Sequence, residues 1–263
     1  MTPPIHRHAS LPSTQDILHR MAEDGAPDGT VVVAEVQEGA RGQRGRTWLA
    51  PLGGLWMSVL VRPKAAAAGE VLSVRAGLAV ARTLAAYPSL PPLSLKWPND
   101  LLLGDRKVGG LLCEARWRGS ELWWVVVGLG LNVANPVPAE LQGQAATLAE
   151  YDPTLTAVAL LGPLAAALAT LGEAGPTLTA EEREEFAGRH WLKGRRLSGP
   201  VPGVAGGGGG RRGADGGAGG RGDDGGAGGE RGVGVIGTRC AARGARAPLV
   251  RCPASRDPRP ETR

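Results

Sequence analysis

The chain has 263 residues, 42% of them hydrophobic, which is enough for one large domain or two smaller ones. Its composition changes near residue 200: every Trp, Tyr and Phe lies at or before Trp191, whereas 19 of the 42 Gly fall between Gly203 and Gly237. Residues 204–263 hold 11 Arg and 6 acidic residues, while residues 1–203 hold 19 basic and 19 acidic ones. The net charge of +5 therefore belongs to the tail, and it argues only weakly for nucleic-acid binding by the rest.

The cysteines and the apolar segments indicate in which cellular compartment the protein is expected. Cys113, Cys240 and Cys252 form no CxxC motif, and no His lies near them at a zinc-ligand spacing. The N-terminus lacks an apolar signal core, and the longest apolar stretch, Leu155–Leu171, is shorter than the about 20 residues that span a bilayer. We therefore expect a cytoplasmic protein with reduced thiols, no fixed metal site and no membrane partner.

The first ninety residues alternate between helical and strand-like patterns. Ser13 or Thr14 is expected to cap a helix that continues through Met21. Two strands are predicted on either side of a Gly- and Arg-rich loop, and a second helix follows. The strands are Thr30–Val36 and Gly54–Val61, the loop is Gln37–Arg46, and the second helix is Gly69–Tyr87.

The second half begins with strands and ends with helices. Strands are predicted over Leu93–Trp97, Val108–Ala115 and Leu122–Val127, with Asn99–Leu103 leading into a turn at Gly104-Asp105. Leu155–Leu171 is expected to be one helix, or two helices split at Pro163, and a capping box at Thr179–Glu182 opens a last helix through His190. The pattern indicates an α+β domain with a mixed or antiparallel sheet. Beyond Pro202 the composition indicates disorder.

Four polar segments could carry chemistry. Glycines in the loop Gln37–Arg46 let backbone N–H groups approach a ligand, and its arginines can pair with phosphate or carboxylate, but it could equally be a solvated basic loop. Lys96–Asp100 places a lysine at a strand end beside Trp97, although a surface Lys beside a core Trp explains it slightly better. Asp105–Gly110 could equally be an ordinary hairpin turn. Gly128–Asn132 is a weak signal when taken alone, because it lacks a dinucleotide fingerprint and could be a β-bulge or a turn.

In this order and together, the segments resemble the catalytic domain of biotin–protein ligases from Ser13 to Asn132. The pairing of KWPND with a downstream RKxxGxL is highly specific, and a weaker resemblance continues to about Arg196. The matching segments read STQD, AEVQEGARGQRGRTW, GGLWMSV, LKWPNDLLL, DRKVGGLLCE and VVVGLGLNV.

The resemblance implies a fold similar to class II aminoacyl-tRNA synthetases, with a mixed β-sheet flanked by helices. Residues 1–196 would be the catalytic domain. The family normally ends in a small β-barrel, which residues 197–263 replace with a Gly/Arg-rich tail that is either disordered or the product of a shifted reading frame. Only twelve residues precede Ser13, so we expect no winged-helix domain and no DNA partner, whereas a homodimer stays open.

The implied reaction uses ATP, Mg²⁺ and biotin, forms biotinyl-5'-AMP, and transfers biotin to a lysine of a carrier such as the biotin carboxyl carrier of acetyl-CoA carboxylase. Two anions must meet, so the site needs cations. The resemblance assigns catalysis to Lys96, Lys107 and Arg41. It assigns biotin to Ser13, Thr14, Gln15, Gln37, Arg41, Gly42, Gln43 and Lys107, and ATP to Arg44, Arg46, Lys96, Asn99 and Asn132, with Trp56 and Trp97 as pocket walls or core and Cys113 as core.

The loop departs from the family pattern G-R-G-R-x-G-R in two places. Ala40 replaces the first Gly, and Gln43 replaces the second Arg, which keeps hydrogen bonds but removes a charge. We therefore expect the adenylate to be held less tightly than is usual. Three other functions remain open: a lipoate–protein ligase of the same superfamily, an RNA-binding protein acting through the Arg/Gly tail, and a folded but inactive fragment.

Overall fold

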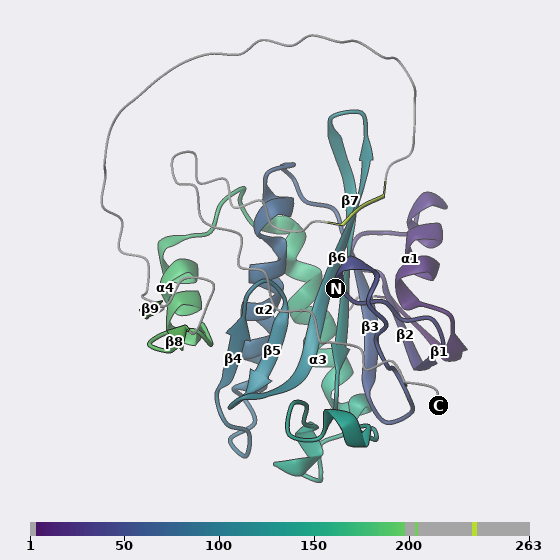
Figure 1. Ribbon diagram of the computed structural model, residues 1–263. Coiled ribbons are helices and arrows are strands. Elements are labelled where there is room, and N and C mark those ends of the chain that lie inside the picture. The colour runs from purple at the N-terminus through teal and green to yellow at the C-terminus, as the bar shows by residue number, and fades with distance from the viewer. Residues whose placement is uncertain (1–3, 198–202, 205–232, 236–263) are drawn as a thin grey trace, which may run out of the picture.

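A mixed β-sheet organises the chain (Figure 1). The computed structural model describes residues 4–197, 203–204 and 233–235. Seven strands lie in the order β1-β2-β3-β7-β6-β5-β4, in which β1 runs parallel to β2 and all other neighbours are antiparallel. The strands are β1 Ile5–Leu11, β2 Val31–Gln37, β3 Leu55–Val61, β4 Leu93–Lys96, β5 Asp100–Leu103, β6 Arg106–Arg118 and β7 Glu121–Leu131.

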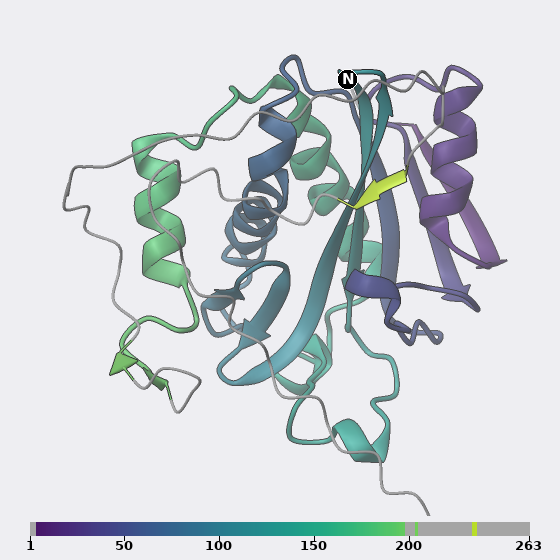
Figure 2. The same ribbon diagram turned by 45° about the horizontal axis from the view of Figure 1, so that its top comes forward.

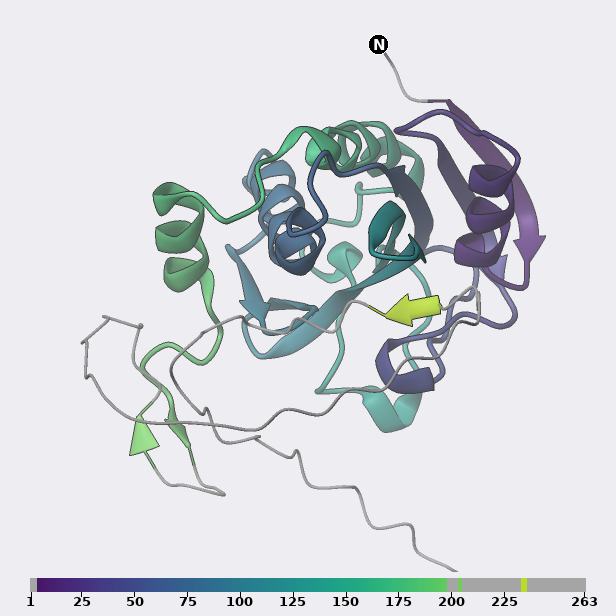
Figure 3. The same cartoon turned by 90° about the horizontal axis from the view of Figure 1, so that it is seen from above.

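Helices cover both faces of this sheet (Figures 2 and 3). Helices α2 and α3 pack side by side on one face, and α1 packs on the opposite face over β2, β3 and β7. A fourth helix, α4, lies against α2 and β4. The bounds are α1 Thr14–Glu23, α2 Ala68–Leu84, α3 Ala157–Ala169 and α4 Ala180–Arg189, with single 3₁₀ turns η1 Gln43–Gly45, η2 Ala139–Leu141, η3 Leu148–Glu150 and η4 Thr170–Glu173.

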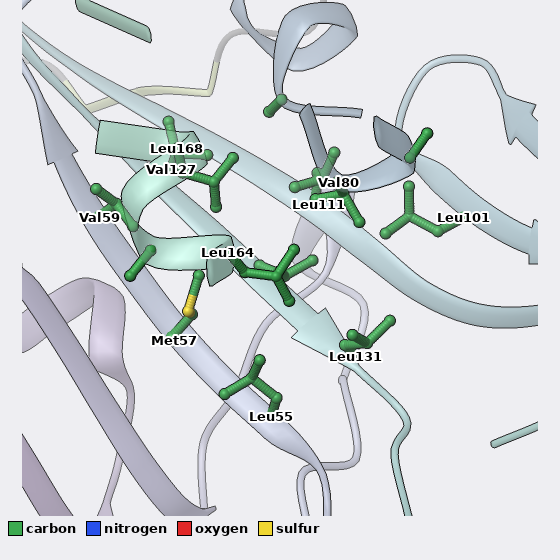
Figure 4. Packing of buried hydrophobic residues seen from close by; sticks show 14 of the residues in the cluster. Leu55, Met57, Val59, Val80, Leu101, Leu111, Val127, Leu131, Leu164 and Leu168 are labelled. Carbon is green, nitrogen blue, oxygen red and sulfur yellow. The ribbon is translucent and has the colours of Figure 1, made fainter. Parts of the chain in front are cut away.

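Alternation along the strands builds the two cores. On β2, Val31 and Val33 point into the large core beneath α2 and α3, whereas Val32 points to the smaller one beneath α1. Figure 4 shows the large core, where Met57 of β3 and Leu164 of α3 are among the labelled side chains that meet. Burial of such side chains from sheet and helices contributes about 1.5–3 kcal/mol each, which fixes the helices on the sheet.

The structure confirms the α+β class with a mixed sheet and most of the expected elements. It also adds one strand, contradicts the expected helix cap and decides the alternatives left open at Pro163. Sequence reading missed β1, an edge strand with charged and polar residues that pairs with β2. Ser13 occupies the N-cap position of α1, but neither its side chain nor that of Thr14 makes a capping bond. Helix α3 continues through Pro163 without a split, because the carbonyl of Ala159 that loses its partner lies on an exposed part of the helix.

The tail contributes three short strands to the described residues. β8 Arg196–Leu197 pairs with β9 Gly203–Val204, and β10 Val233–Val235 pairs antiparallel with Glu114–Arg116 of β6. The remaining expectations for residues 197–263, including the shifted reading frame, lie outside the described residues. Within the described part of the chain, no helix combines the length and apolar character needed to cross a membrane.

A buried arginine attaches α4 to the rest of the domain. Only 3% of the Arg75 side chain, on α2, is exposed, and its guanidinium donates to both carboxylate oxygens of Glu182 and to the carbonyls of Gly175 and Thr177. Glu182 also completes the capping box of α4 with Thr179, as the sequence predicts. Arg75 therefore holds both the first turn of α4 and the segment that leads into it.

We predict that Arg75→Ala lowers the free energy of unfolding by about 3–5 kcal/mol, because it leaves a partly buried carboxylate and two carbonyls without their donor. The matched control is Arg82→Ala, which removes an ion pair between the same two helices but with a side chain that is 54% exposed. It should cost less than about 1 kcal/mol. Urea unfolding of both variants measures the difference, and equal losses would contradict the role of Arg75.

Candidate active site

A cavity of about 810 Å³ opens on the α1 side of the sheet. Its floor comes from β3, β6 and β7, and its walls come from the start of α1 and from two loops, residues 37–51 and 135–145. All the residues singled out in the sequence for biotin or ATP line this cavity except Arg44. They are Ser13, Thr14, Gln15, Gln37, Arg41, Gly42, Gln43, Arg46, Lys96, Asn99, Lys107 and Asn132.

Glycines on β7 make room for the cavity. The strand alternates, so Trp124 and Val126 fill the space beneath α1, and Gly128 and Gly130 continue the same face. A Cβ on Gly128 would meet the side-chain amide of Gln15 at 2.8 Å, and one on Gly130 would meet the Trp48 ring at the same distance. The segment Gly128–Asn132 is thus neither a bulge nor a turn. It is the end of a strand, and its glycines leave space for the side chains of Gln15 and Trp48.

Polar groups from α1 and β3 converge at one end of the floor. The Thr14 and Ser58 hydroxyls are 2.8 Å apart, and the Thr14 backbone N–H donates to the side-chain carbonyl of Gln37 at 2.7 Å. Gln15 donates to the Leu112 carbonyl at 2.8 Å, while its own side-chain oxygen is buried and has no partner among the described residues. A buried acceptor without a donor is costly, so this end suits a ligand that presents N–H groups.

The Gly- and Arg-rich loop folds into a hairpin whose residues Ala40–Gly42 line the cavity. We call Gln37–Ala50, whose two ends pair with each other, the arm. Arg41 donates through both Nη atoms to Asp16, at 3.0 and 2.7 Å. This double hydrogen bond lowers the pKa of Asp16 and raises that of Arg41, so the pair stays charged at neutral pH. The positive charge of Arg41 therefore already faces a carboxylate.

Two lysines, from the end of β4 and from β6, line the cavity in different surroundings. Lys107 lies 2.6 Å from a carboxylate oxygen of Asp100, and its ammonium is 5.1 Å from the centre of the Trp48 ring. Lys96 has no carboxylate within ion-pair distance among the described residues, and its ammonium lies 4.8 Å from the centre of the Trp191 ring. Lys96 is therefore a cation whose charge an incoming anion can pair with directly.

The two asparagines support the backbone at this end. Asn99 donates to the Leu111 carbonyl at 2.9 Å, and Asn132 donates to the Ala146 carbonyl at 3.2 Å and accepts from Asn135. Their amides join β5, β6 and β7 to the loops beyond, so in this structure they order the cavity wall. Their expected contacts with ATP stay a prediction, as do the ligand contacts of the other lining residues.

The structure decides between the alternatives left open for two tryptophans. Trp56 is fully buried in the core, where its indole donates to the Pro51 carbonyl, whereas Trp97 is 46% exposed and is neither core nor cavity wall. The aromatic walls are Trp48 and Trp191, which the sequence reading did not assign. Trp48 directly follows the arginine loop, a signal that could have been used, whereas only tertiary contacts bring Trp191 to the site. The expected ATP ligand Arg44, at φ 59°, points from the tip of the arm without lining the cavity.

Cys113 belongs to the core, as expected. It is 3% exposed, and burial raises the pKa of its thiol to about 12, so it stays protonated and is no nucleophile at neutral pH. Among the described residues, no cluster of three His, Cys, Asp or Glu side chains could hold a metal ion.

Comparisons with known proteins agree on one family. A profile of the biotin/lipoate A/B protein ligase family matches residues 8–132. The chain is 34% identical over 148 residues to the bifunctional ligase/repressor BirA of Bacillus subtilis, covering 54% of this chain and 45% of that one. It is 35% identical over 178 residues to a biotin–[acetyl-CoA-carboxylase] ligase of Mycobacterium tuberculosis, covering 64% and 65%. The match spans less than half the length of the two Bacillus BirA proteins that are among these relatives.

Solved structures give the same result. A biotin protein ligase from Aquifex aeolicus in complex with biotin and ATP superimposes with a TM-score of 0.61 at 27% identity, over 76% of this chain and 86% of that one. A Leishmania major biotin protein ligase in complex with biotin gives 0.62 at 25% identity, over 78% and 88%. With the cavity lined largely by the matched segments, residues 8–132 of this chain belong to the biotin/lipoate A/B protein ligase family.

Proposed function

We propose that this chain is a biotin–[biotin carboxyl-carrier protein] ligase. In the first step, a carboxylate oxygen of biotin attacks the α-phosphorus of ATP, the bond to the β-phosphate breaks, and pyrophosphate leaves. In the second step, a lysine amine of the carrier attacks the acyl carbon, loses its proton, and displaces AMP. Relatives of this chain are solved with biotin and ATP or with biotinyl-5-AMP, which supports both substrates.

One observation carries the proposal: cations from three separate segments face a single cavity. Arg41 comes from the arm, Lys96 from the end of β4, and Lys107 from β6, and all three line it. Bringing a carboxylate to a phosphate is opposed by their like charge, and preformed cations offset that repulsion in the transition state. We assign this task to Lys96 and Lys107, with Arg46 available at the rim, and we assign Mg²⁺ to the phosphates of the nucleotide with which it enters.

The polar end of the floor favours biotin over lipoate. The ureido group of biotin offers two N–H donors and one carbonyl acceptor, which match the unpartnered oxygen of Gln15 and the hydroxyls of Thr14 and Ser58. The dithiolane ring of lipoate offers no such donors. Release of pyrophosphate that depends on biotin and ATP, followed by labelling of a carrier domain, tests the function. Incorporation of lipoate in place of biotin would overturn it in favour of the other family activity.

We predict that Lys96→Ala and Lys107→Ala each slow biotin-dependent pyrophosphate release by about 10²–10³-fold, because each removes a cation from the reacting groups. The control is Lys64→Ala, whose side chain is 68% exposed, pairs with Glu173, and is absent from the cavity wall. It should retain the rate of the unaltered chain. Retention of that rate by both cavity variants would exclude the proposed site.

We predict that Gln15→Leu raises the KM for biotin at least about tenfold and leaves the KM for ATP nearly unchanged. It removes the acceptor at the ureido end of the cavity together with the hydrogen bond to the Leu112 carbonyl, and neither lies near the lysines. Leucine keeps a similar volume, so Gly128 still fits against it. Steady-state pyrophosphate release at varied biotin and varied ATP separates the two constants. Equal rises in both would show that the substitution disturbs the whole cavity instead.

The arm suggests a third variant, because Gln43 lines the cavity where relatives are expected to carry an arginine. Gln43→Arg adds a charge at the cavity wall, so it should slow the release of biotinyl-adenylate from the protein. Trapping of the free adenylate after a single turnover measures this rate. An unchanged rate would refute the expectation that this chain retains its intermediate poorly.

A further inference from the structure

The outer half of the arm depends on side-chain contacts for its attachment to the rest of the domain. The two strands of the arm form backbone hydrogen bonds with each other. Gln37 pairs with Ala50, and Arg41 pairs with Thr47. The backbone N–H of Trp48 donates to the Ala40 carbonyl at 3.0 Å. The backbone bonds of the arm to the body of the domain lie near its base, where Glu38 and Gly39 donate to the carbonyls of Leu11 and Pro12. What fixes its outer half is therefore a matter of side-chain contacts.

Two side chains reach from the outer half to the rest of the domain. Trp48 packs in the space that Gly130 leaves on β7. Arg41, on the other strand of the arm, donates to both carboxylate oxygens of Asp16 in the first turn of α1. A second carboxylate stands behind the first, since an oxygen of Glu114 on β6 lies 3.8 Å from the same guanidinium.

The second carboxylate is fixed by buried neighbours. The Glu114 side chain is 7% exposed and lies 3.4 Å from Nε2 of His19, whose side chain is 5% exposed. The other ring nitrogen of His19 accepts a hydrogen bond from the Trp124 indole at 3.0 Å. Asp16 of α1 and Glu114 of β6 thus present two carboxylates to one arginine of the arm.

We propose that Asp16 is a positioning residue that keeps the arm closed over the cavity by pairing with Arg41. Asp16 does not line the cavity, so it acts only through the arginine. Closing a loop over an active site keeps water out and retains a reactive intermediate. The kinetic half of this inference rests on the proposed ligase function, whereas the closure of the arm does not depend on which ligand is bound.

Limited trypsinolysis of the full chain tests the closure, because the arm carries three cleavable bonds, after Arg41, Arg44 and Arg46. Asp16→Asn keeps the shape of the side chain and removes its charge. Mass spectrometry of fragments ending at these arginines should show cleavage about three- to fivefold faster than in the unaltered chain, the size expected of a half-exposed ion pair. Added salt should speed cleavage of the unaltered chain but not of the variant.

The matched control is Glu38→Gln, which removes a charge from the arm itself, where Glu38 accepts only from the exposed Ser10 hydroxyl. It should leave cleavage unchanged. If Asp16→Asn is cut no faster than this control while its thermal unfolding is unaltered, the inference is wrong. A variant that unfolds at a lower temperature is compared instead at equal distance below its midpoint, and equal cleavage there also overturns the inference.

A second measurement separates this inference from the proposed function. With biotin and ATP present, Asp16→Asn should release biotinyl-adenylate about three- to fivefold faster, with little change in the rate of pyrophosphate release in the first turnover. If neither the unaltered chain nor the variant releases pyrophosphate, but the variant is still cut faster in the arm, then the ligase function fails and the positioning role stands. If adenylate release is unchanged although the arm opens, closure does not retain the intermediate, and the kinetic half fails.

Discussion

The site depends on glycines at two positions on one face of β7, where this strand forms the floor of the cavity. The same strand is fully apolar on its other face, where Val125, Val127 and Leu129 pack under α2 and α3. Because successive side chains alternate, the strand can be anchored by one face while Gly128 and Gly130 leave the other open. A side chain at either position would collide with Gln15 or Trp48. The stability of the fold and the existence of the cavity thus come from opposite faces of one strand.

The charges around this space are arranged unevenly. Arg41 and Lys107 each face a carboxylate, whereas Lys96 lies against the Trp191 ring without one among the described residues. A site with every cation exposed would repel itself and attract any anion, whereas paired cations are oriented and partly neutralised. We infer that Asp100 orients Lys107 within the cavity, and that Lys96 adds a second charge with which an incoming anionic group can pair directly.

The segment after α4 links the site to the end of the domain. The backbone N–H of Trp191 donates to the Leu95 carbonyl. The indole N–H of Trp191 donates to the carboxylate of Asp105, which also forms an ion pair with Arg195. Arg75 holds the start of α4, so a buried ion pair on the far side of the sheet and a tryptophan at the cavity belong to one continuous piece of chain. Changes in the region after residue 189 can therefore reach the site through Trp191.

The sequence by itself determined the class of fold and the strands and helices with strong periodicity, because apolar alternation and capping act within a few residues. The set of segments expected to meet at the site came from the resemblance to biotin–protein ligases, since each segment alone also had an ordinary structural explanation. It missed β1, which is recognisable only by its pairing with β2. It left open whether α3 is one helix or is split at Pro163, since the exposure of one carbonyl decides whether a helix tolerates proline. Only the tertiary structure decided which side chains are free to act: the pairing of Arg41 with Asp16, the burial of Trp56, and the arrival of Trp191 all join residues distant in the chain, and no local pattern records such contacts.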